Sequence, residues 1–206
     1  MSVKTKETIN FAECKQQAST WAKERLHDSS TLIVDTETTG ILRQDPETEI
    51  CQLSVINTKG QPVLSLLVNP SRPIPMVVQK IHGITSEDVK DAPTFKEIAP
   101  LLYSTFQGKN VVAYNAQFDI HLIWHLFDKY KSPKPECTIH CAMEQYAAWN
   151  NVWDERKDDF KWQKLPKLAY GKAHDALTDC MSTLELMKLM AYERKTDDSE
   201  LLALDF

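Results

Sequence analysis

Two carboxylates, Asp35 and Glu37, stand two residues apart at the end of a β-branched, apolar run that begins at Thr31. On a strand, residues two apart project from the same face, roughly 6–7 Å from each other. Two such anions at the edge of a buried sheet repel each other unless a cation lies between them. Carboxylate oxygens are hard ligands that suit Mg²⁺ or Mn²⁺. An isolated Asp-x-Glu is more often a solvated strand end, so this pair needs support from elsewhere in the chain.

A third acid, Asp119, falls in the first turn of a predicted helix that follows a strand ending at Tyr114. The helix dipole favours an anion there, so a plain first-turn acid is an equally simple interpretation. Asn115, immediately before the helix, has the residue type of an N-cap. These positions alone do not distinguish chemistry from helix capping.

His174 and Asp179 flank the start of the last predicted helix, and Asp175 between them is the expected N-cap. Histidine titrates near neutral pH, so His174 could accept a proton from water, although a lone histidine is more often a surface residue. Together, the four carboxylates and one histidine match the needs of a two-metal phosphodiester hydrolase. In that mechanism, ions about 3.5–4 Å apart activate water and stabilise the leaving oxygen.

The elements that must position these residues can be predicted from the hydrophobic pattern. We expect strands over 31–35, 50–55, 62–68, 109–114 and 136–139, with a hairpin loop at 58–61. We expect helices over 76–81, 93–106, 117–130, 141–149 and 174–192. Consecutive strands with short turns favour antiparallel pairing, and later strand–helix alternation favours parallel crossovers. The prediction is an α/β fold with a mixed central sheet flanked by helices.

Composition sets the broader limits. The 206 residues suffice for one α/β domain, and 42% hydrophobic with 26% charged residues excludes a disordered chain, a collagen-like repeat and a coiled coil. A net charge of −5 argues against a generic nucleic-acid coat protein but allows a nucleic-acid enzyme whose carboxylates hold cations. The chain shows no signal peptide or apolar run of about 20 residues. Its five scattered cysteines favour reduced thiols, so we expect a cytoplasmic protein.

At this point the sequence resembles the DnaQ-like 3′–5′ exonucleases of the DEDDh type, such as the proofreading ε subunit of bacterial DNA polymerase III. The resemblance runs from about residue 31 to about residue 191. It rests on four stretches in the family's order, which are 34–40, 81–85, 114–119 and 174–179. It implies an RNase H-like fold, with three antiparallel strands and two parallel ones in the sheet.

The resemblance also implies roles for the acids and the histidine. Asp35, Glu37 and Asp179 would bind one Mg²⁺ or Mn²⁺, Asp35 would bridge to a second ion, and Asp119 would hold that second ion. His174 would be the general base. The expected products are nucleoside 5′-monophosphates released from the 3′ end of single-stranded DNA.

The same resemblance implies a nucleotide pocket. Thr38, Thr39 and Gly40 would hold the terminal nucleotide, and His82 and Phe118 would line the pocket. His82 could instead cap the short helix before Gly83, and Phe118 could serve core packing. The implied partners are 3′ ends of single-stranded DNA or RNA, with a polymerase or repair complex as a further candidate.

Three organisational predictions complete the analysis. We divide the chain into an N-terminal helical extension (1–30), a DnaQ-like exonuclease domain (31–193) and a short acidic tail (194–206). Cys137, His140 and Cys141 lack the further ligands that a structural zinc site needs. Residues 149–172 combine tryptophans with lysines, which we interpret mainly as an amphipathic helical segment, with one or two residues contacting the nucleic acid.

Some functional alternatives stay open at this level. The same chemistry could trim RNA 3′ ends, because a 2′-hydroxyl is sensed by fine pocket geometry. A non-catalytic relative that binds a 3′ end or a partner is a second class. An RNase H-type endonuclease shares the acidic core, but the His-x₄-Asp pair and the Thr-Thr-Gly turn favour the exonuclease.

Overall fold

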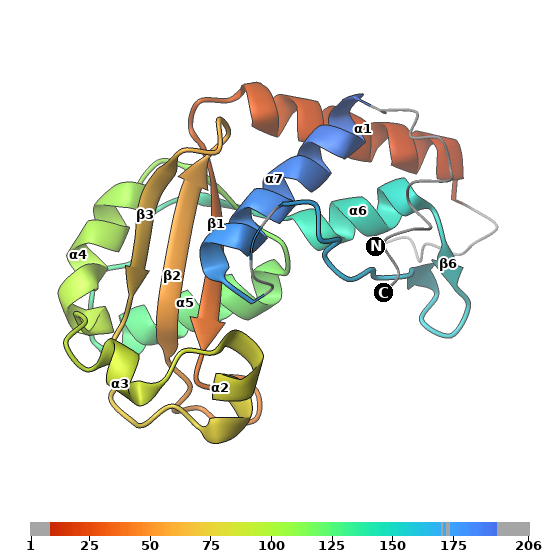
Figure 1. Ribbon diagram of the computed structural model, residues 1–206. Helices are drawn as coiled ribbons and strands as arrows, with labels where there is room; N and C mark the ends of the chain where they lie inside the picture. The colour runs from red at the N-terminus through yellow and green to blue at the C-terminus, as the bar shows by residue number, and fades with distance from the viewer. Residues whose placement is uncertain (1–8, 170, 172–173, 193–206) are drawn as a thin grey trace.

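A five-stranded mixed sheet forms the centre of the protein (Figure 1). The computed structural model describes residues 9–169, 171 and 174–192. The strand order is β3-β2-β1-β4-β5; β1, β2 and β3 pair antiparallel, and β1, β4 and β5 pair parallel. This confirms the predicted mixed sheet. The strands are β1 (Thr31–Thr38), β2 (Ile50–Asn57), β3 (Pro62–Leu67), β4 (Asn110–Ala113) and β5 (Thr138–Cys141).

Helices cover both faces of this sheet (Figure 1). α4 and α5 lie against one face, and α7 lies across the other with α1 and α6 beside it. The short α2 and α3 sit in the connection between β3 and α4. The bounds are α1 (Phe11–His27), α2 (Met76–His82), α3 (Ser86–Val89), α4 (Phe95–Phe106), α5 (Ala116–Lys129), α6 (Ala142–Asn150) and α7 (Ala176–Tyr192).

The central strand β1 shows why the sheet needs two helical layers. Leu32 and Val34 are buried in the cluster that includes α4 and α5, whereas Ile33 is buried in the cluster that includes α7. Successive side chains of a strand point to opposite faces, so an unbroken apolar run requires cover on both sides. The alternation also decides the faces that the following Asp35, Thr36 and Glu37 present.

The N-terminal helix α1 packs against α7 and α6. Its Ala18 and Ala22 are fully buried, and Trp21 and Leu26 add partly buried contacts, which confirms the predicted packing face. Asn10 caps the helix by accepting a hydrogen bond from the Glu13 N–H at 3.2 Å. The proposed boundary at residue 30 stays a prediction, and the acidic tail at 194–206 lies outside the described residues.

Two parts of the sheet and its surroundings differ from the sequence prediction. β5 begins at Thr138 rather than 136, because this edge strand pairs only where β4 offers partners, from Asn110↔Thr138 to Ala113↔Cys141. The short helix α3 was not predicted; a capping box between Thr85 and Asp88 stabilises it.

The interpretation of 149–172 as a mainly helical segment is wrong. α6 ends at Asn150, and a small hairpin follows, formed by β6 (Trp153–Asp154) and β7 (Asp159–Phe160). Trp153 and Phe160 pack edge to face across the hairpin at 5.4 Å and enclose Phe11 of α1 at 5.9 and 5.7 Å. This aromatic contact with a helix more than a hundred residues earlier favours a hairpin where periodicity favoured a helix. Residues 161–168 then continue without regular structure.

Candidate active site

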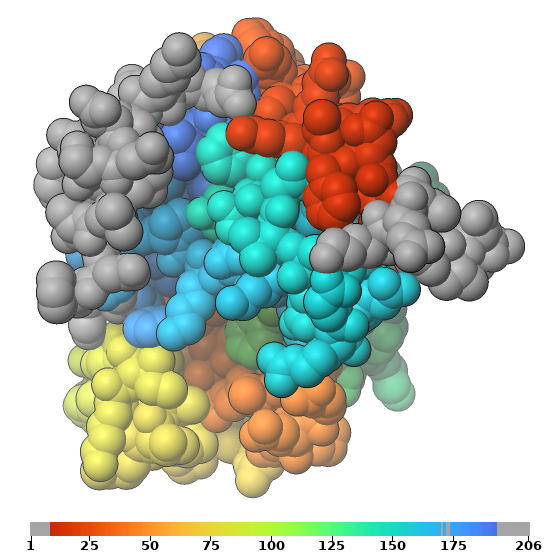
Figure 2. Space-filling model, turned by 90° about the vertical axis from the view of Figure 1, so that its right-hand side faces the viewer, coloured from red at the N-terminus to blue at the C-terminus, as the bar shows by residue number. Residues whose placement is uncertain are grey.

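A cavity of about 570 Å³ lies where β1 and β4 end side by side. Figure 2 shows the hollow between α2 and the loop after β1 (yellow and orange) on one side and residues 152–168 (cyan) on the other. Every site residue predicted from the sequence lines this cavity: Asp35, Glu37, Thr38, Thr39, Gly40, His82, Phe118, Asp119, His174 and Asp179. The sequence analysis missed other lining residues, among them Thr36, Ile41, Val77, Ile81, Tyr114 and Leu165.

Asp119 reaches the cavity from the first turn of α5 and is buried. Its Oδ1 accepts two hydrogen bonds from Thr36, one from the backbone N–H at 3.0 Å and one from the hydroxyl at 2.6 Å. Burial raises the pKa of Asp119 to about 7, against the lowering effect of the Thr36 hydrogen bonds. Thr36 therefore fixes this carboxylate at the strand that carries the other two acids.

Asp179 reaches the same cavity from the first turn of α7. One ligand atom from each of Glu37, His174 and Asp179 lies within 4.8 Å of the others, which is a metal-binding arrangement. Across the described part of the chain, no other set of three His, Cys, Asp or Glu side chains comes together in this way. Burial raises the pKa of Asp179, and the nearby His174 opposes that shift.

Asp35 sits between the two helix acids. Burial raises its pKa well above the ordinary value, and repulsion from Asp119, Asp179 and Glu37 raises it further. Clustered carboxylates that repel one another are stabilised when cations replace protons between them. The hard oxygen donors of these four residues fit Mg²⁺ or Mn²⁺.

The start of α7 is held by Gln52 on β2. The Gln52 amide donates to Asp175 Oδ2 at 2.9 Å, and its carbonyl accepts from the Ala176 N–H at 3.1 Å. Asp175 Oδ1 accepts from the Thr178 N–H and hydroxyl, both at 3.1 Å, which confirms the predicted N-cap. Although burial opposes ionisation, the hydrogen bonds from Gln52 and Thr178 keep the pKa of Asp175 below its usual value. Gln52 thus connects the sheet to the helix that carries Asp179.

The turn after β1 is fixed by its own hydrogen bonds. The Thr38 hydroxyl donates to the Gly40 carbonyl at 2.7 Å. The Thr39 hydroxyl accepts from the Glu49 N–H at 2.9 Å, and the Thr39 N–H donates to the Glu49 carbonyl at 2.9 Å. Both hydroxyls therefore have protein partners, and a role in substrate binding stays a prediction for Thr38, Thr39 and Gly40.

His82 combines the two interpretations left open by the sequence. It is buried, and its Nδ1 accepts from the Ile84 N–H at 3.0 Å, which closes the turn at Gly83 (φ 80°). The same ring lines the cavity, as does the half-buried Phe118. Asn115 precedes α5, but its side chain makes no capping hydrogen bond, so that prediction is wrong. Asn115 lines the cavity instead.

The fold and the acidic cavity define an RNase H-like nuclease, and comparison with known proteins gives the family. The family model RNase T, described as "Exonuclease", matches residues 32–187. The chain belongs to this exonuclease family. The resemblance to DnaQ-like proteins is confirmed by relatives named DNA polymerase III subunit epsilon, such as that of Pasteurella multocida, 29% identical over 159 residues, covering 70% of this chain and 63% of the relative.

Other relatives are named as exonucleases. An uncharacterized exonuclease of Escherichia phage 186 is 34% identical over 197 residues, which covers 89% of this chain and 97% of the relative. Exodeoxyribonuclease 10 of Escherichia coli is 31% identical over 160 residues, covering 75% of this chain and 66% of the relative. Several further relatives are much longer, and the chain spans 14% and 11% of two of them.

Solved structures show the same fold. Exonuclease X in complex with 5′ overhanging duplex DNA aligns with a TM-score of 0.54 at 24% identity, covering 84% of this chain and 98% of that one. E. coli exonuclease I in a complex with single-stranded DNA aligns with a TM-score of 0.65 at 19% identity, covering 84% of this chain and 42% of that one. In the described residues, no helix has the length and apolar character to cross a membrane.

Proposed function

We propose that this exonuclease removes nucleoside 5′-monophosphates from the 3′ end of single-stranded DNA with two divalent ions. The observation that carries the proposal is the convergence of four carboxylates and one histidine on a single cavity. Relatives named exodeoxyribonuclease and DNA polymerase III subunit epsilon support DNA as the substrate. The ε-subunit relatives also make a polymerase or repair complex a candidate partner.

Asp35, Glu37 and Asp179 would hold one Mg²⁺ or Mn²⁺, and Asp35 with Asp119 would hold the second. When bound, such ions lower the pKa of water and neutralise charge that develops on the phosphate. Thr36 keeps Asp119 oriented through its two hydrogen bonds. The turn at 38–40, with His82 and Phe118, would hold the terminal nucleotide.

His174 would take the proton from the attacking water. It is exposed, it precedes the N-cap Asp175, and a ring nitrogen lies within 4.8 Å of carboxylate oxygens of Glu37 and Asp179. The same closeness fits a metal ligand, so a variant must separate the two roles. His174→Ala should lower kcat about 10²–10⁴-fold and leave Mg²⁺ affinity nearly unchanged if the ring is the general base. A parallel loss of Mg²⁺ affinity would make it a ligand instead.

The test of the function is digestion of single-stranded DNA and RNA oligonucleotides labelled at the 5′ end, with Mg²⁺, with Mn²⁺ and with EDTA. We expect a metal-dependent ladder that shortens from the 3′ end and is lost in Asp35→Ala. A circular single strand should resist, whereas its cleavage would indicate an endonuclease. A stronger ladder on RNA would reassign the substrate to RNA 3′ ends. Absence of cleavage by folded protein would favour a non-catalytic binding role.

A further inference from the structure

The two sides of the catalytic cavity differ in chemistry. On one side, Ile41, Val77 and Ile81 line the cavity and are 43%, 68% and 50% exposed. Across from them, residues 161–168 pass beside the cavity, and Leu165 lines it (Figure 2). This second side, which we call the lysine rim, carries Lys161, Lys164 and Lys167.

The lysine rim is positively charged without compensation from its own sequence. The preceding hairpin mixes acids with bases, but residues 160–169 contain three lysines and no acid. All three lysines are exposed. Within the described part of the chain, no carboxylate forms an ion pair with any of them. Such a run attracts a polyanion.

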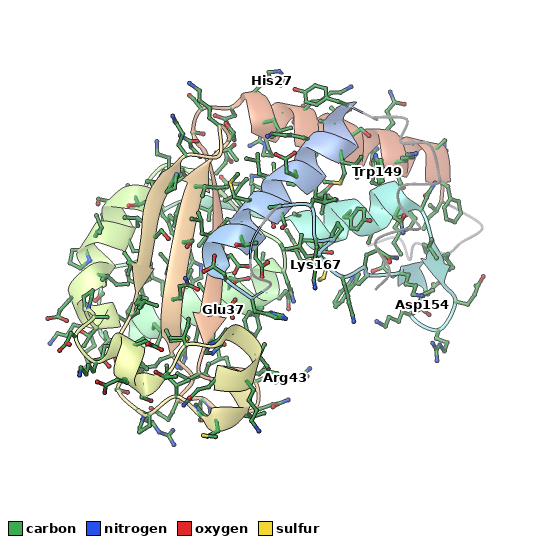
Figure 3. All side chains as sticks on the ribbon, in the orientation of Figure 1. His27, Glu37, Arg43, Trp149, Asp154 and Lys167 are labelled. Carbon is green, nitrogen blue, oxygen red and sulfur yellow. The ribbon has the colours of Figure 1, made fainter. Side chains whose placement is uncertain are left out.

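The rim is also held in place. The Tyr114 hydroxyl donates to the Gln163 carbonyl at 2.8 Å, and the Lys161 N–H donates to the Val152 carbonyl at 2.7 Å. Leu165 and Leu168 pack on the cluster beneath α7. Lys167 lies close enough to Asp179 to stabilise that carboxylate, and Figure 3 shows Lys167 on the side of the cavity toward the hairpin.

Trp162 adds an aromatic surface to the rim. The ring is 52% exposed, which is unusual for so large an apolar side chain. The Lys157 ammonium lies over it, 5.1 Å from the ring centroid, a cation–π contact that holds the indole in position. Exposed aromatics beside cations are the features with which proteins bind single-stranded nucleic acid.

We propose that the lysine rim binds the sugar–phosphate backbone of single-stranded DNA outside the catalytic cavity, with Trp162 as a stacking platform. This inference rests on the proposed function and deepens it. A single strand has an anionic backbone and flat apolar bases. The lysine rim matches the backbone, and the apolar side formed by Ile41, Val77 and Ile81 matches the bases. The rim would therefore govern affinity for longer strands and leave the chemical step unchanged.

The test compares two triple variants that lose the same charge. One replaces the rim lysines by glutamine (Lys161→Gln, Lys164→Gln, Lys167→Gln). The matched control replaces three exposed lysines that do not line the catalytic cavity: Lys23 on α1, Lys59 in the β2–β3 turn and Lys96 on α4. Binding of a fluorescent dT₂₀ strand is measured by anisotropy in EDTA, at several salt concentrations. Because no cleavage is needed, this readout is independent of the proposed reaction.

The rim variant should bind dT₂₀ more weakly, and the magnitude of its log K against log [salt] slope should fall by about 2, at ~0.7 for each phosphate contact. Trp162→Ala should weaken binding about fivefold or more, and Trp162→Phe should retain most of it. Equal slopes for the rim and control variants would overturn the inference.

Activity distinguishes this outcome from failure of the proposed function. In the rim variant, KM for dT₂₀ should rise with kcat unchanged. Hydrolysis of the p-nitrophenyl ester of thymidine 5′-monophosphate, which is too short to reach the rim, should stay at the wild-type rate. If the wild-type protein binds dT₂₀ through the rim but hydrolyses neither substrate, the proposed function fails and this inference survives. A rim variant that slows the ester as much as dT₂₀ would contradict the inference.

Discussion

Thr36 donates both its backbone N–H and its hydroxyl to one oxygen of Asp119, at 3.0 and 2.6 Å. The side-chain alternation of β1 explains this contact. Asp35 and Glu37 project toward the α7 face, whereas Thr36 between them projects toward α5, which carries Asp119. One strand segment thus organises carboxylates from both helical layers.

Removing the Thr36 hydroxyl should therefore weaken metal binding without touching a proposed ligand. We expect Thr36→Val to lower Mg²⁺ affinity or activity about 10–100-fold, as loss of a hydrogen bond to a ligand typically does. Thr36→Ser keeps the hydroxyl and should remain close to wild type. A Mg²⁺ titration of exonuclease activity measures both variants, and an unchanged midpoint for Thr36→Val would show that the hydroxyl does not orient Asp119.

The contact between Gln52 and Asp175 predicts an exchange that restores activity. Gln52→Glu alone places a second carboxylate against Asp175, and Asp175→Asn alone disturbs the hydrogen bonds at the start of α7, so each should reduce kcat. The double variant swaps the two groups, so a carboxylate at position 52 can accept from an amide at position 175 and from the Ala176 N–H. Its net charge equals that of the wild type.

We expect kcat of this double variant to exceed the value that the two single losses predict together, as a double-mutant cycle measures. Thermal unfolding of all four proteins serves as the control for global stability. Additive losses in kcat would exclude a positioning role for this contact.

The raised pKa of Asp119 predicts the pH dependence of stability in the metal-free protein. Its folded-state pKa of about 7 exceeds the unfolded value, so the folded protein binds this proton more tightly. Linkage then requires the stabilisation to be fully present below about pH 4 and to disappear as the pH rises to about 7.

Urea unfolding in EDTA at several pH values tests this directly. Asp119→Asn, which cannot ionise, should lose less stability than wild type between the two limits, and Mg²⁺ should restore wild-type stability at high pH. Identical pH profiles for the two proteins without metal would mean that Asp119 titrates normally.

The packing of α1 predicts that this helix stabilises the exonuclease fold. Ala22 is completely buried in the cluster shared with α7, so Ala22→Leu should overpack it and destabilise the protein by about 1–3 kcal/mol. Ala12→Leu, at an exposed position of the same helix, is the control. Thermal unfolding compares them, and equal melting temperatures would support treating residues 1–30 as a dispensable extension.

Local patterns were sufficient to predict most elements and all the acids of the site. The β-branched run from Thr31 predicts a strand, and Gly83 and Thr94 mark helix ends through backbone conformation and capping, which depend on near neighbours. Asp35, Glu37, Asp119 and Asp179 could be found because each stands at the end of a predictable element. Their roles also followed from a resemblance in four short stretches.

Tertiary structure decided what holds those acids and what surrounds them. Thr36 meets Asp119 across 83 positions and Gln52 meets Asp175 across 123, contacts set by strand order and by the face each side chain takes. Phe11 favours a hairpin in a segment with helical periodicity, because its ring packs against two aromatic rings from far along the chain. Such contacts depend on which surfaces the sheet brings together, and no window of local sequence contains that information.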